Sequence, residues 1–115
     1  MISNEYYDWA SDGSGDATVD IPFFKGYVIK SFRSVPGEEG DLATDLPTNL
    51  YGITLINNLT KADVLVSQGA SRSGTVADNA LYPNPPIPVP CAMTLTIASA
   101  GVAKQGRVYI DFQAT

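Results

Sequence analysis

Apolar and polar residues alternate through much of this chain with the two-residue period of β-strands. The clearest stretch is 50–74, where every second residue of 51–55 is aromatic or aliphatic before the turn-forming sequence at 57–61. A second aliphatic run follows at 63–66. Because only a short loop separates the two runs, the pattern predicts an antiparallel hairpin in this stretch.

The same alternation predicts further strands at 17–24, 27–35, 91–98 and 107–112. Residues expected to point into the core from the last two strands are Met93, Leu95, Ile97, Val108, Ile110 and Phe112. Pro22 has no backbone donor, so we expect a sheet edge, a bulge or a strand end there. The glycine-containing connection at 99–106 predicts a second hairpin.

Proline and glycine break the chain elsewhere. The acidic segment 36–49 is too irregular for a strand or a helix and predicts a long loop, whereas the prolines of 82–90 require an extended backbone. No stretch of ten or more residues has helical spacing. The predicted fold class is all-β: an antiparallel β-sandwich or a jelly-roll-like small barrel with long Pro/Gly loops.

The 115 residues suffice for one domain that folds without disulfides or metal. The aromatic segment that opens the sequence lies outside the clear alternation and is followed by a turn rich in Gly, Ser and Asp. We therefore expect residues 1–15 to form an N-terminal arm and turn, and residues 16–115 to form a single β-sandwich domain.

The composition excludes several classes of partner and site. A net charge of −5 argues against a nucleic-acid partner, because such binding depends on Lys and Arg neutralising phosphates. The chain has no histidine and a single cysteine, Cys91, which removes the commonest general base, an internal disulfide and a thiolate zinc site. With neither a long apolar run nor the features of a signal peptide, it is expected to be made in a cytoplasm without a membrane partner.

Three possible chemical sites are considered and set aside. Asp12–Asp16 begins like a calcium loop, but Phe23 stands where the bidentate Glu belongs, so the pattern favours a plain turn. Gly69–Gly74 lacks the glycine of a nucleophile elbow and the ending of a phosphate loop. Cys91 opens an apolar strand, which favours a buried, inert thiol. We therefore expect a protein that is not an enzyme and holds no cofactor or metal.

Aromatic residues carry the remaining signal. They line either a protein interface or a sugar-binding face, or they simply pack within the strands; packing is favoured for Tyr109, and less so for the three aromatic residues near the start. The residues predicted to form an interface are Tyr6, Tyr7, Trp9, Tyr82, Pro85, Pro86 and Arg72.

A series of short motifs occurs along the chain. In order they are Gly15–Thr18 (GDAT), Gly26-Tyr27, Pro36-Gly37, Leu50–Leu55 (LYGITL), Ala62–Leu65 (ADVL), Gly69–Thr75 (GASRSGT) and Ala103–Val108 (AKQGRV). Taken together, the series resembles a family of small virion proteins encoded among the head genes of tailed bacteriophages. The proline-rich segment and the aromatic opening depart from the family pattern.

The resemblance implies a capsid decoration, or cement, protein located in the virion. Such a protein binds the major capsid protein on the outer surface of the head and stabilises the shell by bridging neighbouring subunits. We expect it to act as a homo-oligomer, with a trimer considered before a dimer. Two alternatives stay open: a head-to-tail connector or tail structural protein, and a carbohydrate-binding module for attachment to a host surface.

Overall fold

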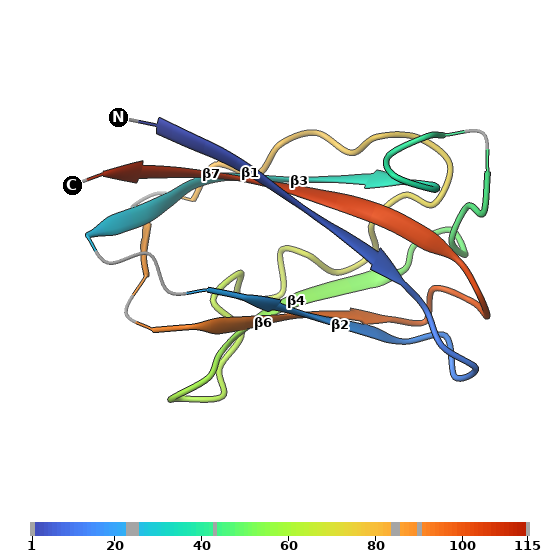
Figure 1. The fold of residues 1–115 in the computed structure, drawn as a ribbon, viewed down its shortest axis with the longest axis horizontal. Helices are drawn as coiled ribbons and strands as arrows, with labels where there is room; N and C mark the ends of the chain where they lie inside the picture. The colour runs from blue at the N-terminus through green and yellow to red at the C-terminus, as the bar shows by residue number, and fades with distance from the viewer. Residues whose placement is uncertain (1, 23–25, 43, 84–85, 90, 115) are drawn as a thin grey trace.

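The structure, a computed structural model, describes residues 2–22, 26–42, 44–83, 86–89 and 91–114. Within these residues the chain forms strands and no helix. The strands are β1 (Ile2–Ala10), β2 (Ala17–Ile21), β3 (Tyr27–Pro36), β4 (Gly52–Asn57), β5 (Ile87–Pro88), β6 (Met93–Ala98) and β7 (Gln105–Ala114). They build a four-stranded sheet, β1-β7-β3-β5, and a three-stranded sheet, β2-β6-β4. The predicted all-β fold is confirmed as a small two-sheet sandwich (Figure 1).

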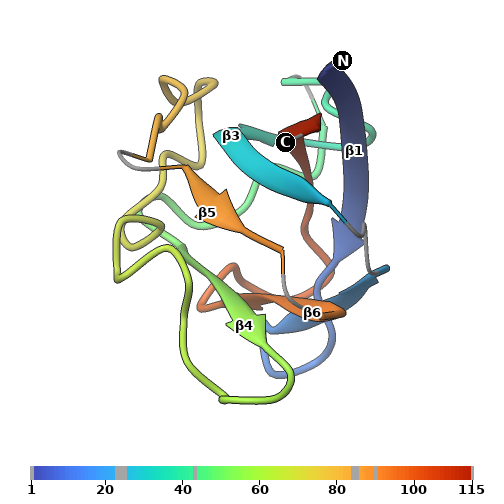
Figure 2. The same ribbon diagram turned by 90° about the vertical axis from the view of Figure 1, so that its left-hand side faces the viewer.

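Consecutive strands alternate between the two sheets along the whole described chain. Figure 1 shows the layer of β1, β7 and β3 above that of β2, β6 and β4, and Figure 2 shows β5 beside β3 in the upper layer. All described strand pairs are antiparallel, and each joins strands that are not neighbours in the sequence. Every connection therefore crosses from one layer to the other.

The core lies between the layers and is built from alternate residues of the strands. On β6 and β7 the inward residues are those that the alternation predicted, and all are fully buried: Met93, Leu95, Ile97, Val108, Ile110 and Phe112. Tyr51, Ile53 and Leu55 are also buried, which confirms the predicted inward face of that strand. One apolar side of each sheet is thus removed from water.

The hairpin predicted within 50–74 is wrong in its second half. Residues 64–69 form a turn, and Asp63 before it makes an isolated bridge to Ile56 of β4. The Asp63 carboxylate accepts hydrogen bonds from the backbone N–H groups of Leu55 and Leu65, each at 3.0 Å. Because a side chain takes these donors, the segment curls instead of continuing as a strand. Strand β4 pairs with β6 instead.

The hairpin predicted across 99–106 is also wrong, because β6 and β7 belong to different sheets. The connection crosses the end of the sandwich and packs on the turn at 11–16. Ala100 N–H donates to the Gly15 carbonyl at 2.9 Å, and Ser11 N–H donates to the Lys104 carbonyl at 2.8 Å. Two loops far apart in sequence thus close the same end of the fold.

The segment expected to be a terminal arm is instead strand β1. It pairs with β7 over its full length, from Ile2 opposite Gln113 to Ala10 opposite Gln105. The segment carries aromatic side chains on both of its faces, which hides the alternation from the sequence. The turn expected after it is present at 11–16, where the Asp12 carboxylate accepts from the backbone N–H groups of Ser14 (2.8 Å) and Asp16 (3.2 Å).

Proline and glycine act where their chemistry predicts. Strand β2 lies at the edge of its sheet and ends at Ile21, directly before Pro22. The loop predicted at 36–49 is present among its described residues, with β3 running through Pro36. Gly37 begins it with a φ of 100°, and a Cβ there would lie 1.7 Å from the Asp41 carbonyl oxygen. Only glycine fits this turn.

Candidate functional site

The outer face of the four-stranded sheet carries the most chemically diverse side chains on the described strands. The two-residue period of the strands turns one set of residues outward from the three long strands of this sheet: Asn4, Tyr6 and Asp8 from β1; Arg107, Tyr109 and Asp111 from β7; and Ser31, Arg33 and Val35 from β3. These residues lie on the rigid part of the molecule, so their positions are set by the sheet.

Arg107 is the centre of a compact cluster on this face. Its Nε lies 2.7 Å from Asp8 Oδ1 and its Nη2 lies 3.0 Å from Oδ2, which makes a two-pronged ion pair across β1 and β7. The guanidinium also sits 4.0 Å from the centre of the Tyr6 ring, and Nη1 donates to the Tyr109 hydroxyl at 3.3 Å. The hydrogen bonds to Asp8 and then to Tyr109 raise the pKa of Arg107, so this cation is permanent.

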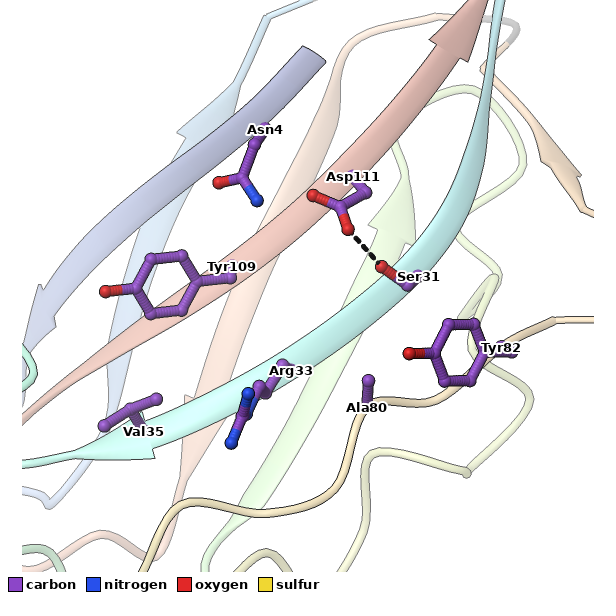
Figure 3. A pocket seen from close by; sticks show the side chains of 8 residues that line it. All are labelled: Asn4, Ser31, Arg33, Val35, Ala80, Tyr82, Tyr109 and Asp111. Carbon is purple, nitrogen blue, oxygen red and sulfur yellow. Dashed lines mark hydrogen bonds between the residues drawn. The ribbon is translucent and has the colours of Figure 1, made fainter. Parts of the chain in front are cut away.

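Beside this cluster lies a groove of about 430 Å³ (Figure 3). Its lining residues are Asn4, Ser31, Arg33, Val35, Ala80, Tyr82, Tyr109 and Asp111. Ser31 Oγ donates to Asp111 Oδ2 at 2.7 Å across β3 and β7. The other oxygen, Asp111 Oδ1, is buried beside Asn4 and has no hydrogen-bond partner among the described residues. The groove floor therefore holds a carboxylate with accepting capacity left over.

Two tyrosines stand on opposite sides of the groove, Tyr109 from β7 and Tyr82 from the loop that follows β4 (Figure 3). Tyr82 is 72% exposed, and nothing packs over most of its ring. Arg33 lies between them on β3, and its Nε donates to the carbonyl of Asp78 at 3.2 Å. The groove thus has aromatic walls with one cation and one anion between them.

Arg72 was predicted to lie at an interface, but it is only 6% exposed, and that prediction is wrong. Its Nε donates to Ser34 Oγ at 2.7 Å and lies 3.4 Å from an Asp78 carboxylate oxygen, while Nη2 donates to the Asn79 carbonyl at 3.2 Å. These bonds tie the loop that carries Tyr82 to strand β3. Arg72 therefore positions one wall of the groove and is almost entirely buried within the chain.

Trp9 was also predicted to lie at an interface, but it is 3% exposed and belongs to the core, where its ring centre lies 5.4 Å from that of Tyr51. Tyr7 faces the same way and is half-buried, and that burial, with a smaller effect from Glu5, raises its pKa to about 12. Tyr6 points to the opposite face and is 54% exposed. Of the three N-terminal aromatic residues, Tyr6 is the one with an exposed side chain.

The remaining sequence predictions have mixed outcomes. Pro86 is exposed, whereas Pro85 lies outside the described residues. Tyr109, expected to be packed, lies on the outer face opposite Tyr6, with the ring centres 6.2 Å apart. Cys91 is half-buried rather than buried, and its thiol donates to the Asn57 side-chain oxygen at 3.1 Å.

The possible calcium loop is a plain turn in its geometry. Hydrogen bonds from the backbone at Asp16 and then Ser14 lower the pKa of Asp12, whose carboxylate is therefore already engaged. Among the described residues, no three His, Cys, Asp or Glu side chains gather as metal ligands would. No helix in the described part of the chain is long and apolar enough to cross a membrane.

Sequence reasoning missed most of the groove, including Asn4, Ser31, Arg33 and Asp111. A partial signal exists for Arg33 and Val35, which alternate with the buried Phe32, Ser34 and Pro36, but a bulge between Ile29 and Ser31 interrupts the pattern before Ser31. Nothing local in the sequence shows that β3 lies beside β7, which brings Ser31 opposite Asp111.

Searches of family models, curated proteins and solved structures return no match for this chain. The function is therefore argued from the chain's own residues and geometry.

Proposed function

We propose that this chain is a capsid decoration protein of a tailed bacteriophage, which binds the major capsid protein on the outer surface of the head and bridges neighbouring subunits. The order of motifs along the sequence supports the proposal. The structural observation that carries it is strand β1, which is nine residues long, pairs with β7 on one side and forms the edge of the four-stranded sheet on the other.

A long edge strand leaves a row of backbone donors and acceptors open to a partner strand. Natural edge strands are commonly blocked by proline or by charged side chains, lysine above all; β1 has no proline or lysine, and its charged residues are Glu5 and Asp8. Trp9, buried beneath the strand, and the Arg107–Asp8 ion pair above it hold the backbone in place. A partner strand from the shell therefore meets an edge that is already ordered, and little conformational entropy is lost on binding.

Binding of this kind stabilises a shell by mass action, because a protein that binds assembled subunits and not free ones shifts the equilibrium toward the assembly. An oligomer, either a trimer or a dimer, places several β1 edges around one symmetry axis and engages several subunits together. Decoration requires only a rigid scaffold and exposed binding surfaces. The β1 edge meets that requirement.

The test compares two charge reversals in co-sedimentation with mature capsids of the parent phage. Glu5 is half-buried on the face of β1 that carries Tyr7 and Trp9, and an inward-pointing lysine there obstructs an incoming strand. We expect Glu5→Lys, once urea unfolding has shown that it is folded, to bind about tenfold or more weakly. Asp20→Lys makes the same charge change on the exposed face of β2, at an edge of the other sheet, and should bind like the unmodified chain. Equal binding by both variants would show that β1 is not the contact.

Electron microscopy of labelled virions tests the location. Copies spread over the whole shell are the expected result. Label confined to a ring at one vertex would contradict decoration and favour the connector or tail alternative. No association of the unmodified chain with capsids would overturn the proposal outright.

A further inference from the structure

The groove on the outer face has a charge composition that selects among ligands. Its charged lining residues are one guanidinium, Arg33, and one carboxylate, Asp111. An anionic ligand is repelled by the Asp111 carboxylate at the groove floor and by the net charge of −5 on the chain. A cationic ligand is repelled by the Arg33 guanidinium. A neutral polar ligand avoids both repulsions.

The polar groups of the groove also call for a ligand that both donates and accepts hydrogen bonds. Asp111 is an acceptor, Arg33 is a donor, and the side chains of Ser31, Asn4 and the two tyrosines do both. Asp111 Oδ1 has no described partner, and Asn4, an exposed side chain on β1, lies beside it. When Asn4 turns aside, a ligand hydroxyl can donate to this oxygen and satisfy it.

The tyrosine walls require that the same ligand also present apolar surface. An aromatic face is electron-rich and attracts the weakly positive hydrogens of C–H bonds. A pyranose ring offers this combination, with hydroxyl groups around its rim and C–H bonds on its faces. The groove volume of about 430 Å³ lies within the range of small-molecule sites, roughly 300–1,000 Å³.

We propose that the groove between Tyr109 and Tyr82 is a binding subsite for a neutral saccharide, whose hydroxyls bond Asp111, Arg33 and Asn4 and whose ring packs on the tyrosines. This activity goes beyond the proposed capsid role and does not depend on it, since the groove lies on the sheet face whereas shell attachment uses the backbone edge of β1. The chain then carries two separate surfaces: an edge for the shell and a face for a glycan.

The test begins with the full-length chain on an array of neutral and acidic glycans, including fragments of bacterial surface polysaccharides. The neutral glycan retained most strongly is then titrated into isotope-labelled protein while the backbone amide signals are followed by NMR. We expect saturable shifts confined to Asn4, the 31–35 segment, the 80–82 segment and 109–111. Inorganic phosphate and lysine amide, titrated in parallel, should give no saturable shift.

Two variants test the residues. Tyr82→Ala removes an exposed ring that no described packing requires and should raise the dissociation constant about tenfold. Asp111→Asn keeps the side-chain shape and an oxygen for Ser31 but removes an acceptor, and it should weaken binding by a similar factor. The matched control is Leu59→Ala, which removes an equally exposed apolar side chain in the turn after β4, outside the groove lining, and should bind like the unmodified chain.

Several results would overturn the inference. These are the absence of any retained neutral glycan, saturable binding of phosphate or lysine amide in its place, and sugar-induced shifts located elsewhere on the chain. A loss of binding in Leu59→Ala as large as that in Tyr82→Ala would also contradict a site in the groove. None of these results bears on capsid binding, which is measured separately.

Discussion

The outer faces of the two sheets cover the same core with very different side chains. The four-stranded sheet presents Tyr109 and Asp111 in a groove, and Tyr6 and Arg107 in a cluster beside it. On the three-stranded sheet, Thr18 and Thr54 both lie opposite Thr96, so threonines form a row across all three strands. Threonine is a residue that pleated surfaces favour for their own stability, and cross-strand threonine pairs add to it.

The side chains of the two faces differ in how far sheet stability explains them. A threonine row is explained by sheet formation alone. Exposed tyrosines such as Tyr82 bury little area within the chain, and an exposed ion pair such as Arg107–Asp8 adds at most about 1 kcal/mol to stability. Tyrosine and arginine are, however, the residues that dominate binding surfaces. This comparison supports the proposal that the four-stranded face is the binding face.

The largest expected effect lies beneath the binding face. Trp9→Ala removes a buried indole from the core and should lower the free energy of unfolding by about 3–5 kcal/mol in urea titrations. Tyr6→Ala, on the opposite face of the same strand, should lower it by less than about 1 kcal/mol. Similar losses for the two variants would mean that β1 is not oriented as described.

The next effect concerns the two arginines near the groove. Arg72→Ala breaks buried hydrogen bonds and leaves Asp78 without its cation, so the free energy of unfolding should fall by about 2 kcal/mol. Arg33→Ala alters an exposed residue and should change stability by less than about 0.5 kcal/mol. Thermal unfolding checks both variants, and a larger loss for Arg33→Ala would contradict the assigned roles.

A third prediction concerns the pH dependence of stability, which tests the interior separately from the outer faces. Burial raises the pKa of Tyr51 from its ordinary value of 10.0 to about 12, because burial disfavours the charged phenolate. The unfolded chain therefore loses this proton first, so the stability from Tyr51 is complete below pH ~10 and is lost as the pH rises toward 12. The midpoint of thermal unfolding should fall across this window and fall less steeply in Tyr51→Phe. An equal slope in the variant would contradict the assignment.

The smallest effect is expected on the threonine face. Thr96→Ala removes the centre of the threonine row and should cost less than about 1 kcal/mol in urea unfolding. Saccharide binding should not change, because the groove is on the other side of the core. A variant that stays folded but loses glycan binding would show that the two faces are not independent.

Local pattern predicted the strands well where one face is apolar. Alternation identified the inward residues of β6 and β7 because polar residues separate them. In β1, the aromatic residues Tyr6 and Tyr7 point to opposite faces, so hydrophobicity alone did not reveal the strand. At Asp63, side-chain hydrogen bonds to the backbone outweighed the aliphatic character of the residues that follow.

The local pattern could not predict the groove, for a different reason. Its floor joins Ser31 to Asp111, and its wall depends on Arg72 reaching Ser34. These partners are brought together by strand order, and periodicity does not determine which strands become neighbours. The aromatic residues did point to a binding surface, but they did not separate Tyr82, which is exposed, from Trp9, which is buried.

The strict alternation of strands between layers also determines how the chain reaches its native state. No strand can pair with its neighbour in sequence, so each ladder closes a long loop before any pairing energy is gained. Folding should therefore be slow for a domain of this size. During synthesis, β1 has no partner strand until β7 has been made. Until then the aromatic side chains of β1 are exposed, and a chaperone that holds unfolded chains would bind them.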